Sequence, residues 1–426
     1  MDKREYEQLK SKFVQNVSLK LIALVIAGIA SYLFYFIMVR MLSVEDYGLL
    51  YSIIALTYIL TVPHETIRTV MAKYTVELAA KKEYGKIKGL FFSSIKRIML
   101  YSVIVFFIFL VLSPLIMNVL HAPFASMMII AAALLVAFVL PVVWGSLQGL
   151  QYFGHLGLNN SIETAVKLLI AITLVYIGFG VNGALIAIPV SMVVAFFAGF
   201  WPLRKVMKKK AEKFRFEPHI LKYSLATFVI MAFFVAMYSV DVIAVRYFFS
   251  AKSSGLYGGI AVIGRVLIFI SIAITRVMFS AVAEHHGKTY DVKGYLKARK
   301  VLYMAMASVL AVDLAFLAVS IFAPQAVISL VLGSNYLEAA PLLKYMIIAM
   351  GALALSSLII FYNLSINWSK RLTARILGTF VFIEIILFFV FSHSLREILI
   401  MIMSVNVLLF LALCFTLLLK KHKEKV

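Results

Sequence analysis

Charged side chains are scarce in this sequence of 426 residues, since Asp, Glu, Lys and Arg together make up only 14% of it. An ordinary soluble domain contains about 25% charged residues. Hydrophobic residues reach 63%, and the mean hydropathy is +1.01. A soluble enzyme, a disordered chain and a secreted domain held by disulfides are all poor interpretations of these proportions. The composition is typical of a protein that crosses a membrane several times.

Cysteine and the common catalytic motifs are missing as well. The single cysteine, Cys414, has no partner for an internal disulfide and lies in an apolar run. The sequence contains no His-Glu-x-x-His, Walker or Gly-x-Ser-x-Gly motif, and its one histidine pair, His285-His286, lacks further ligands at metal-binding spacing. We therefore expect a protein that is not an enzyme, with no catalytic residue, no metal site and no cofactor.

Twelve apolar segments are each long enough to cross a bilayer, which takes about 20 residues. The first lacks a small-residue cleavage site, so we expect a true span rather than a signal peptide. The sequence therefore predicts an all-α integral membrane protein with twelve transmembrane helices. The segments lie near 17–39, 48–71, 98–119, 124–147, 157–178, 181–203, 220–245, 256–283, 301–322, 342–366, 372–392 and 397–419.

The basic residues are distributed unevenly between the connections of these spans. The chain has 41 Lys and Arg against 19 Asp and Glu, for a net charge of +22. With the N-terminus in the cytoplasm, 31 of the 41 basic residues fall in inner segments and 5 in outer ones. Cytoplasmic loops collect Lys and Arg, so this asymmetry explains the charge without nucleic acid. It predicts a multi-pass protein of the cytoplasmic membrane with both termini in the cytoplasm.

The longest polar connection in mid-chain, 204–218, contains three consecutive lysines, Lys208 to Lys210. It separates six apolar segments in 1–203 from six in 219–426. We expect an N-terminal six-helix bundle, a basic cytoplasmic linker and a C-terminal six-helix bundle with these bounds.

The two halves also repeat a short pattern in the same order. Arg40 and Gly48 after the first span correspond to Arg246 and Gly255 after the seventh, and further pairs follow at a nearly constant offset. Because each half has an even number of spans, the repeats keep one orientation and are related by an axis along the membrane normal. Such repeats usually frame a substrate path that opens by alternating access.

Three stretches carry a resemblance to a known family. Residues 39–48 resemble the Arg-x-Leu-x-x-x-(Asp/Glu)-(Tyr/Phe)-Gly signature after the first span of polysaccharide-biosynthesis flippases. Residues 145–154 resemble the family's junction of spans four and five, and 332–342 its loop between spans nine and ten. The resemblance covers nearly the whole chain. It points to the polysaccharide-transporter branch of the multidrug/oligosaccharidyl-lipid/polysaccharide exporter superfamily, which includes O-antigen flippases.

This resemblance implies a MATE-like fold, in which two six-helix bundles surround a cationic cavity. It also implies a cargo, a sugar linked to a polyprenyl phosphate or diphosphate whose lipid is undecaprenyl or dolichyl. The head group would enter the cavity while the lipid tail stays among the membrane lipids. The motifs that carry the resemblance are not catalytic, so they identify the fold better than the substrate.

Span two contains the first candidate binding residues. Tyr51, Tyr58, Glu65 and Arg68 are spaced to share one face of a helix that Pro63 bends. Charges that face lipid are costly, so we expect this face to line the cavity, with the tyrosines on sugar rings and the arginine on phosphate. The alternative is a Glu65–Arg68 pair that only neutralises itself.

Spans seven and eight contain the other candidates. Arg265 and Arg276 share a helix face without an acid between them, so they need an anionic ligand or counter-charges on other helices. The alternative for Arg276 is that its side chain extends to the cytoplasmic surface. Asp241 is either an ion-coupling site for H+ or Na+ or the partner of Arg246 or of an arginine in span eight. The repeat-related Arg40 and Arg246 either contact substrate or anchor the membrane interface.

Three further acids lie within spans. Glu163 is predicted to pair with Lys167 on the same helix, four residues on. Asp313 and Glu384 are single acids, for which the sequence indicates nothing beyond a buried partner.

Taken together, the sequence predicts a flippase for a lipid-linked oligosaccharide or polysaccharide precursor. The main alternative is a cation-coupled multidrug or organic-cation antiporter of the same superfamily. The charges within the spans do not distinguish the flippase from the antiporter, because the number of basic residues, five, equals the number of acidic ones. A lipid-dependent glycosyltransferase would need acid-rich loops, which the outer side lacks, and a scaffold for cell-envelope assembly stays open.

Overall fold

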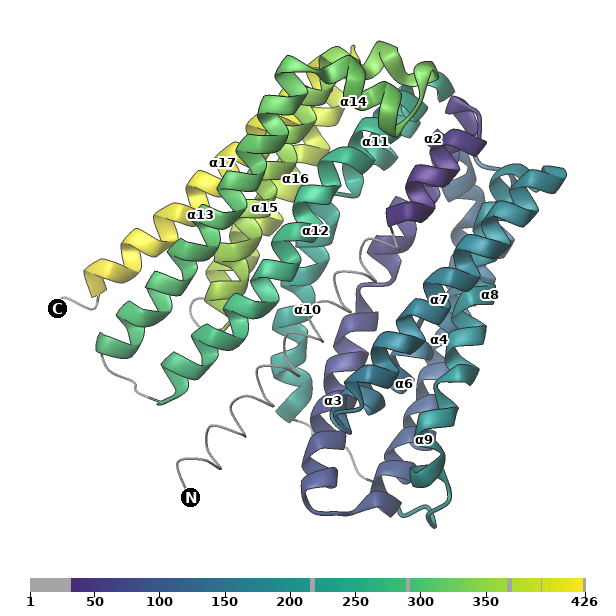
Figure 1. The fold of residues 1–426 in the computed structure, drawn as a ribbon, viewed down its shortest axis with the longest axis vertical. Helices are drawn as coiled ribbons and strands as arrows, with labels where there is room; N and C mark the ends of the chain where they lie inside the picture. Colours follow the sequence, from purple (N-terminus) through teal and green to yellow (C-terminus); the bar gives the residue numbers. More distant parts are fainter. Residues whose placement is uncertain (1–31, 215–218, 289–291, 366–369, 392, 424–426) are drawn as a thin grey trace. The chain divides into compact units, whose positions relative to one another are not determined.

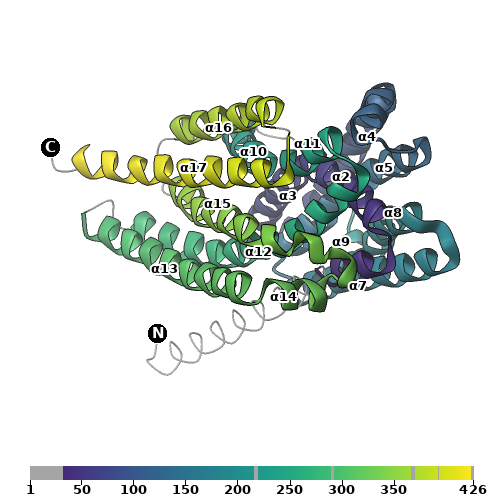
Figure 2. The same cartoon turned by 90° about the horizontal axis from the view of Figure 1, so that it is seen from above.

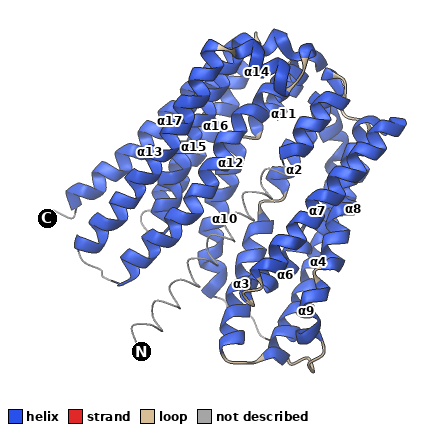
Figure 3. Cartoon of the chain, viewed as in Figure 1, coloured by secondary structure: helices blue, strands red, loops and turns tan. Residues whose placement is uncertain are grey.

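The computed structural model describes residues 32–214, 219–288, 292–365, 370–391 and 393–423, and every regular element within them is a helix (Figures 1 and 3). This confirms the predicted all-α class. The predicted first span begins outside the described residues, and its end is the helix Tyr32–Met41. The described chain forms two compact units.

The first unit comprises the described residues 32–41, 63–117 and 122–214. Besides Tyr32–Met41 it contains α3 (Pro63–Ala80), most of α4 (Tyr84–Leu120), α5 (Phe124–Ala137), α6 (Leu140–Gly149), α7 (Phe153–Leu174), a π-helical turn η1 (Val175–Phe179), α8 (Gly180–Ala198) and α9 (Phe200–Met207).

The second unit comprises 42–62, 118–121 and the described residues from 219 onward. It contains α2 (Val44–Leu60), the last turn of α4, α10 (His219–Met237), α11 (Val240–Phe248), α12 (Ala251–Lys288), α13 (Val292–Phe322), α14 (Pro324–Val331), a 3-10 helix η2 (Ser334–Leu342), α15 (Leu343–Ser365), α16 (Lys370–Val390) and α17 (Leu395–Lys423). The most buried of these is α15, which packs against α12, α13 and α17 (Figure 2).

Within the described residues, eight continuous helices are long and apolar enough to span a membrane, and two bent helix pairs add two more candidates. One of the eight, Phe153–Met207, reverses direction at Gly178 and Gly180, whose positive φ angles of 98° and 52° suit glycine. It therefore accounts for both predicted spans 157–178 and 181–203, and α7 packs along α8 (Figure 1). In the second bent pair, α10 and α11 meet at 41°.

Predicted span two is not one helix. It ends at Leu60 and resumes at Pro63, because proline cannot donate a backbone hydrogen bond and its ring clashes with the preceding turn. The first piece, α2, packs on α11 and α12 in the second unit, whereas α3 packs on α6 in the first. The domain boundaries 1–203, 204–218 and 219–426 thus stay a prediction, since the chain also changes unit at 41–42 and 62–63.

The start of the predicted linker is anchored to the first unit. The backbone N–H of Glu212 donates to the carbonyl oxygen of Gly85 on α4 at 3.1 Å. Lys88 Nζ donates to the carbonyl oxygens of Met207 at 2.6 Å and Lys209 at 3.0 Å. Met207 is the last residue of α9 and Lys209 lies just beyond it, so the ammonium caps the C-terminal end of this helix.

The repeated glycines explain why α2 and α12 pack so closely. A Cβ on Gly48 would lie 2.6 Å from the backbone nitrogen of Gly255, and a Cβ on Gly255 would overlap the carbonyl oxygen of Val44. Ser43 caps α2 by accepting from the backbone N–H of Asp46 at 3.1 Å. The signature at 39–48 therefore starts a helix and brings it into backbone contact with its repeat partner.

We expect Gly255→Ala to lower the free energy of unfolding by about 1–3 kcal/mol, because the added methyl group forces α2 and α12 apart. The midpoint of thermal unfolding of the detergent-purified protein measures this. Gly154→Ala is the matched control, since no atom lies within 4 Å of a Cβ at that position. Equal midpoints for the two variants would contradict the close contact.

Candidate functional site

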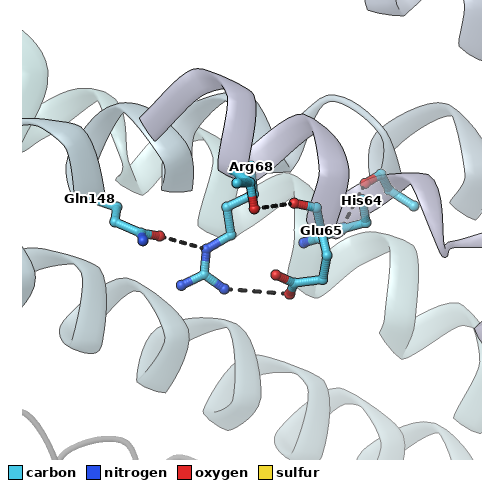
Figure 4. A network of polar contacts seen from close by, with 6 residues as sticks. His64, Glu65, Arg68 and Gln148 are labelled. Carbon is cyan, nitrogen blue, oxygen red and sulfur yellow. Dashed lines mark hydrogen bonds and ion pairs between the residues drawn. The ribbon is translucent and has the colours of Figure 1, made fainter. Parts of the chain in front are cut away.

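The first unit holds Arg68 in a polar cluster between α3 and α6 (Figure 4). Its Nε donates to Oε1 of Gln148 at 3.1 Å, and its Nη1 lies 3.5 Å from Oε1 of Glu65. The side chain of Arg68 is 17% exposed and that of Glu65 is 62% exposed. The predicted Glu65–Arg68 pair is present, but so exposed a carboxylate binds weakly.

Two glycines of the 145–154 motif place Gln148 within reach of Arg68. A Cβ on Gly145 would lie 2.5 Å from the carbonyl oxygen of Arg68, and one on Gly149 would lie 2.6 Å from that of Ala72. The backbone of α6 thus rests directly on α3. The sequence analysis included Gln148 only as part of the motif 145–154 and did not identify it as a candidate site residue, although its place between two glycines was the available signal.

Aromatic and amide side chains surround this cluster. The guanidinium of Arg68 lies 5.9 Å from the ring centre of Trp144. His64 meets the same indole edge-on at 5.3 Å, and its Nδ1 is 3.1 Å from the carbonyl oxygen of Ala137. Trp144 Nε1 donates to Oδ1 of Asn159 at 2.7 Å. These contacts fix the guanidinium plane, and Nη2 has no hydrogen-bond partner among the described residues.

A second polar contact in this unit confirms a prediction. Lys167 Nζ donates to Oε1 of Glu163 at 3.3 Å on α7, and Ser191 of α8 donates to the same oxygen at 3.3 Å. Both charged side chains are largely buried, so they neutralise each other as expected.

The second unit buries an ion pair at its centre. Arg265 Nη2 of α12 donates to Oδ1 of Asp241 on α11 at 2.9 Å, with 2% and 0% of the side chains exposed. The hydroxyl of Tyr257 donates to Oδ2 at 2.7 Å. The guanidinium lies over the rings of Tyr51 and Tyr238, 5.0 and 5.8 Å from their centres. Such stacking suits the planar arginine and strengthens away from water.

This geometry confirms one alternative for Asp241, its pairing with an arginine of span eight. The counter-charge that Arg265 needs is therefore supplied by the protein. Contact of Arg265 with substrate stays a prediction and requires the pair to open.

The tyrosines of predicted span two belong to this second cluster. Tyr51 stacks under Arg265, and Tyr58 meets Tyr238 edge-on at 6.4 Å. Glu65 and Arg68 lie in the other compact unit. The prediction of one continuous helix face for all four residues is wrong, because the chain breaks before Pro63.

The remaining predicted arginines occupy different settings. Arg246 is buried, and its Nε donates to the carbonyl oxygen of Leu120 at 2.8 Å and its Nη2 to that of His121 at 3.4 Å, which caps the last turn of α4. Arg40 is exposed near the end of Tyr32–Met41. Arg276 lies on α12, but its side chain is outside the described residues. Substrate contact at these three arginines stays a prediction.

Within the described part of the chain, no group of three His, Cys, Asp or Glu side chains lies close enough to hold a metal ion.

We expect Arg265→Met to destabilise the protein strongly, because it leaves the buried carboxylate of Asp241 without its cation. Breaking a buried pair in this way costs about 3–5 kcal/mol. Thermal unfolding of the purified protein measures the loss. Asp241→Asn combined with Arg265→Met removes both charges and should recover most of it.

Lys252→Met is the matched control for this prediction. Lys252 pairs with Glu338 at 2.7 Å in the same unit, but the side chains are 52% and 64% exposed. Loss of an exposed pair costs about 0–1 kcal/mol. If Arg265→Met unfolds at the same temperature as Lys252→Met, the buried pair does not stabilise the unit.

Comparison with known proteins identifies the fold. An inward-facing multidrug resistance transporter of the MATE family and the MOP superfamily is 13% identical, with a TM-score of 0.77 over 93% of this chain and 95% of that one. The lipid II flippase MurJ, in an inward closed conformation, is 14% identical, with a TM-score of 0.69 over 93% and 87%. A MOP superfamily transporter from Pyrococcus furiosus, described as having a binding pocket of reverse polarity, is 16% identical, with a TM-score of 0.64 over 94% and 93%.

At these identities the structural likeness shows the fold alone, and it confirms the predicted MATE-like architecture. No curated protein matches the sequence. The model of a family described as polysaccharide biosynthesis protein matches residues 37–341. Because this match extends over most of the sequence, the chain belongs to the polysaccharide biosynthesis protein family.

Proposed function

We propose that this protein is a flippase that moves a lipid-linked oligosaccharide or polysaccharide precursor across the cytoplasmic membrane by alternating access. The observation that carries the proposal is the family match over 37–341 in a chain built from membrane-spanning helices. One solved protein of the same fold is a lipid II flippase. The protein moves its cargo without changing its covalent structure, so we place it among transporters rather than enzymes.

Arg68 is the described residue whose geometry best fits an anionic head group. Its Nε donates to Gln148, the indole of Trp144 lies beside the guanidinium, and Nη2 has no hydrogen-bond partner among the described residues. Phosphate oxygens accept from two guanidinium N–H groups at once. The exposed Glu65 contact, at 3.5 Å, is weak enough for a phosphate or diphosphate to replace it.

The other predicted substrate contacts stay part of this proposal. Tyr51, Arg265 and Arg246 are buried and would reach substrate only after a rearrangement, and the side chain of Arg276 lies outside the described residues. Tyr58 is half-buried and Arg40 is exposed.

Arg68→Ala is expected to slow translocation about 10- to 100-fold, because a hydrogen bond to a charged group contributes about 1.5–3 kcal/mol. The assay follows a fluorescent polyprenyl diphosphate N-acetylglucosamine in proteoliposomes, with a membrane-impermeant quencher reporting the outer leaflet. Arg68→Lys keeps the charge but loses the planar fork, so its rate should fall between those of wild type and Arg68→Ala.

Lys73→Ala is the matched control on the same helix, since Lys73 makes only an exposed 4.0 Å pair with Glu77. It should flip the probe at the wild-type rate. If Arg68→Ala also flips the probe at the wild-type rate, Arg68 is not part of the binding site. If the wild-type protein does not flip the lipid probe but transports a cationic dye, the flippase proposal is wrong and the antiporter alternative is favoured.

Ion coupling at Asp241 is the second part of the proposal. A cation at this carboxylate has to displace the guanidinium of Arg265 from Oδ1. Coupling would then link ion binding to the opening of the buried pair. A response to a Na+ or H+ gradient that survives in the neutral double variant, Asp241→Asn with Arg265→Met, would exclude Asp241 as the coupling site.

The asymmetry of basic residues supports a cytoplasmic location for both termini. A fluorescent protein fused after Val426 is therefore expected to mature and fluoresce in cells, whereas an alkaline phosphatase fused there should be inactive. The opposite pattern would invert the topology.

A further inference from the structure

The structure separates the five acids of the predicted spans into two groups. Glu65, Glu163 and Asp241 each face a basic side chain. Asp313 and Glu384 face no basic side chain among the described residues, and none of their four carboxyl oxygens has a hydrogen-bond partner there. Two acids are thus buried in the membrane-spanning part of the second unit without compensation.

Asp313 lies near the middle of the apolar stretch Ala298–Phe322 of α13. Its side chain is 8% exposed and faces α15. A Cβ on Gly351 would lie 3.2 Å from both Cγ and Oδ2 of Asp313. The carboxyl group therefore fills the space that a side chain at position 351 would occupy, directly on the backbone of the most buried helix.

The elements packed against α13 are α12, α14 and α15, and no described charged or titratable side chain on them faces Asp313. Arg265 of α12 is turned to Asp241 instead. Lys344 lies at the start of α15, about two turns before Gly351. An ionised carboxylate in such a setting is far more costly than a protonated one.

We infer that Asp313, seated on Gly351, is a proton-binding site of this transporter. The acid is neutral while α13 packs on α15, and it ionises when α13 moves off Gly351 and water reaches it. A proton from water forms the O–H bond on one side of the membrane and returns to water on the other. The inference rests on the proposed function, and it assigns the coupling proton to Asp313 as the alternative to ion coupling at Asp241.

Glu384 occupies a different environment. It lies on α16 with 1% of its side chain exposed, within electrostatic range of Asp241 in the ion-pair cluster. Glu384 would reach water only if that cluster opened, whereas Asp313 would reach water when α13 separates from α15. Glu384→Gln is therefore the matched control, being the same change from acid to amide in the same unit.

Infrared spectroscopy of the full-length protein in phospholipid vesicles tests proton binding directly. The carbonyl stretch of protonated carboxylic acids at neutral pH should lose intensity in Asp313→Asn relative to wild type. The isosteric amide should keep the fold, which the midpoint of thermal unfolding checks. An unchanged acid band in a folded Asp313→Asn protein would show an ionised Asp313 and overturn the inference.

Transport under a pH gradient tests coupling, with the fluorescent polyprenyl diphosphate N-acetylglucosamine as probe. We expect a several-fold gradient response in wild type and in Glu384→Gln. Asp313→Asn should give one rate with and without the gradient, because its amide mimics the permanently protonated acid. A wild-type response in Asp313→Asn, or loss of the response in both variants, would overturn the assignment. A wild-type protein that never moves the probe would refute the proposed function, and the infrared result would still decide the proton site.

Discussion

An ionised side chain inside a hydrocarbon layer is so costly that it has to be paired or neutral, and the arrangement of the second unit depends on this constraint. Asp241 is surrounded by Arg265 and the hydroxyl of Tyr257, and the guanidinium is in turn enclosed by aromatic rings. Such a cluster links α2, α11 and α12 through directional bonds rather than through apolar contact alone. Breaking it is expensive, so the cluster stabilises one arrangement of these helices.

The polar groups can meet only because helix backbones approach each other closely. Small residues allow this in membranes, where apolar burial does not drive helices together. Gly48 and Gly255 bring α2 onto α12, and Gly145 and Gly149 bring α6 onto α3. In the first contact Gly48 lies about one helical turn before the tyrosine that stacks on Arg265, and in the second the glycines place Gln148 on Arg68. The motifs that identify the family thus position its charged side chains.

Helix class, most span positions and the Glu163–Lys167 pair could be predicted from the sequence, because they depend on local apolar runs and on spacing along one helix. The partners of Arg265 and Arg68 could not be identified. Asp241 precedes Arg265 by 24 residues, and Gln148 follows Arg68 by 80, so both contacts depend on how separate helices pack. The prediction of one helix face for span two was wrong for a local reason. The helix breaks before Pro63, and an argument from residue spacing assumes one unbroken helix.

The cap that Arg246 provides has a consequence for the order in which the chain is made. The carbonyl oxygens of Leu120 and His121 are satisfied by a residue synthesised about 125 positions later. The partners of α2, which are α10, α11 and α12, also begin only at His219. During translation the early helix α2 and the end of α4 must therefore wait, incompletely packed, until the second half of the chain enters the membrane. The second unit, which combines 42–62 and 118–121 with the chain from 219 onward, is therefore completed only after the second half of the chain has been made.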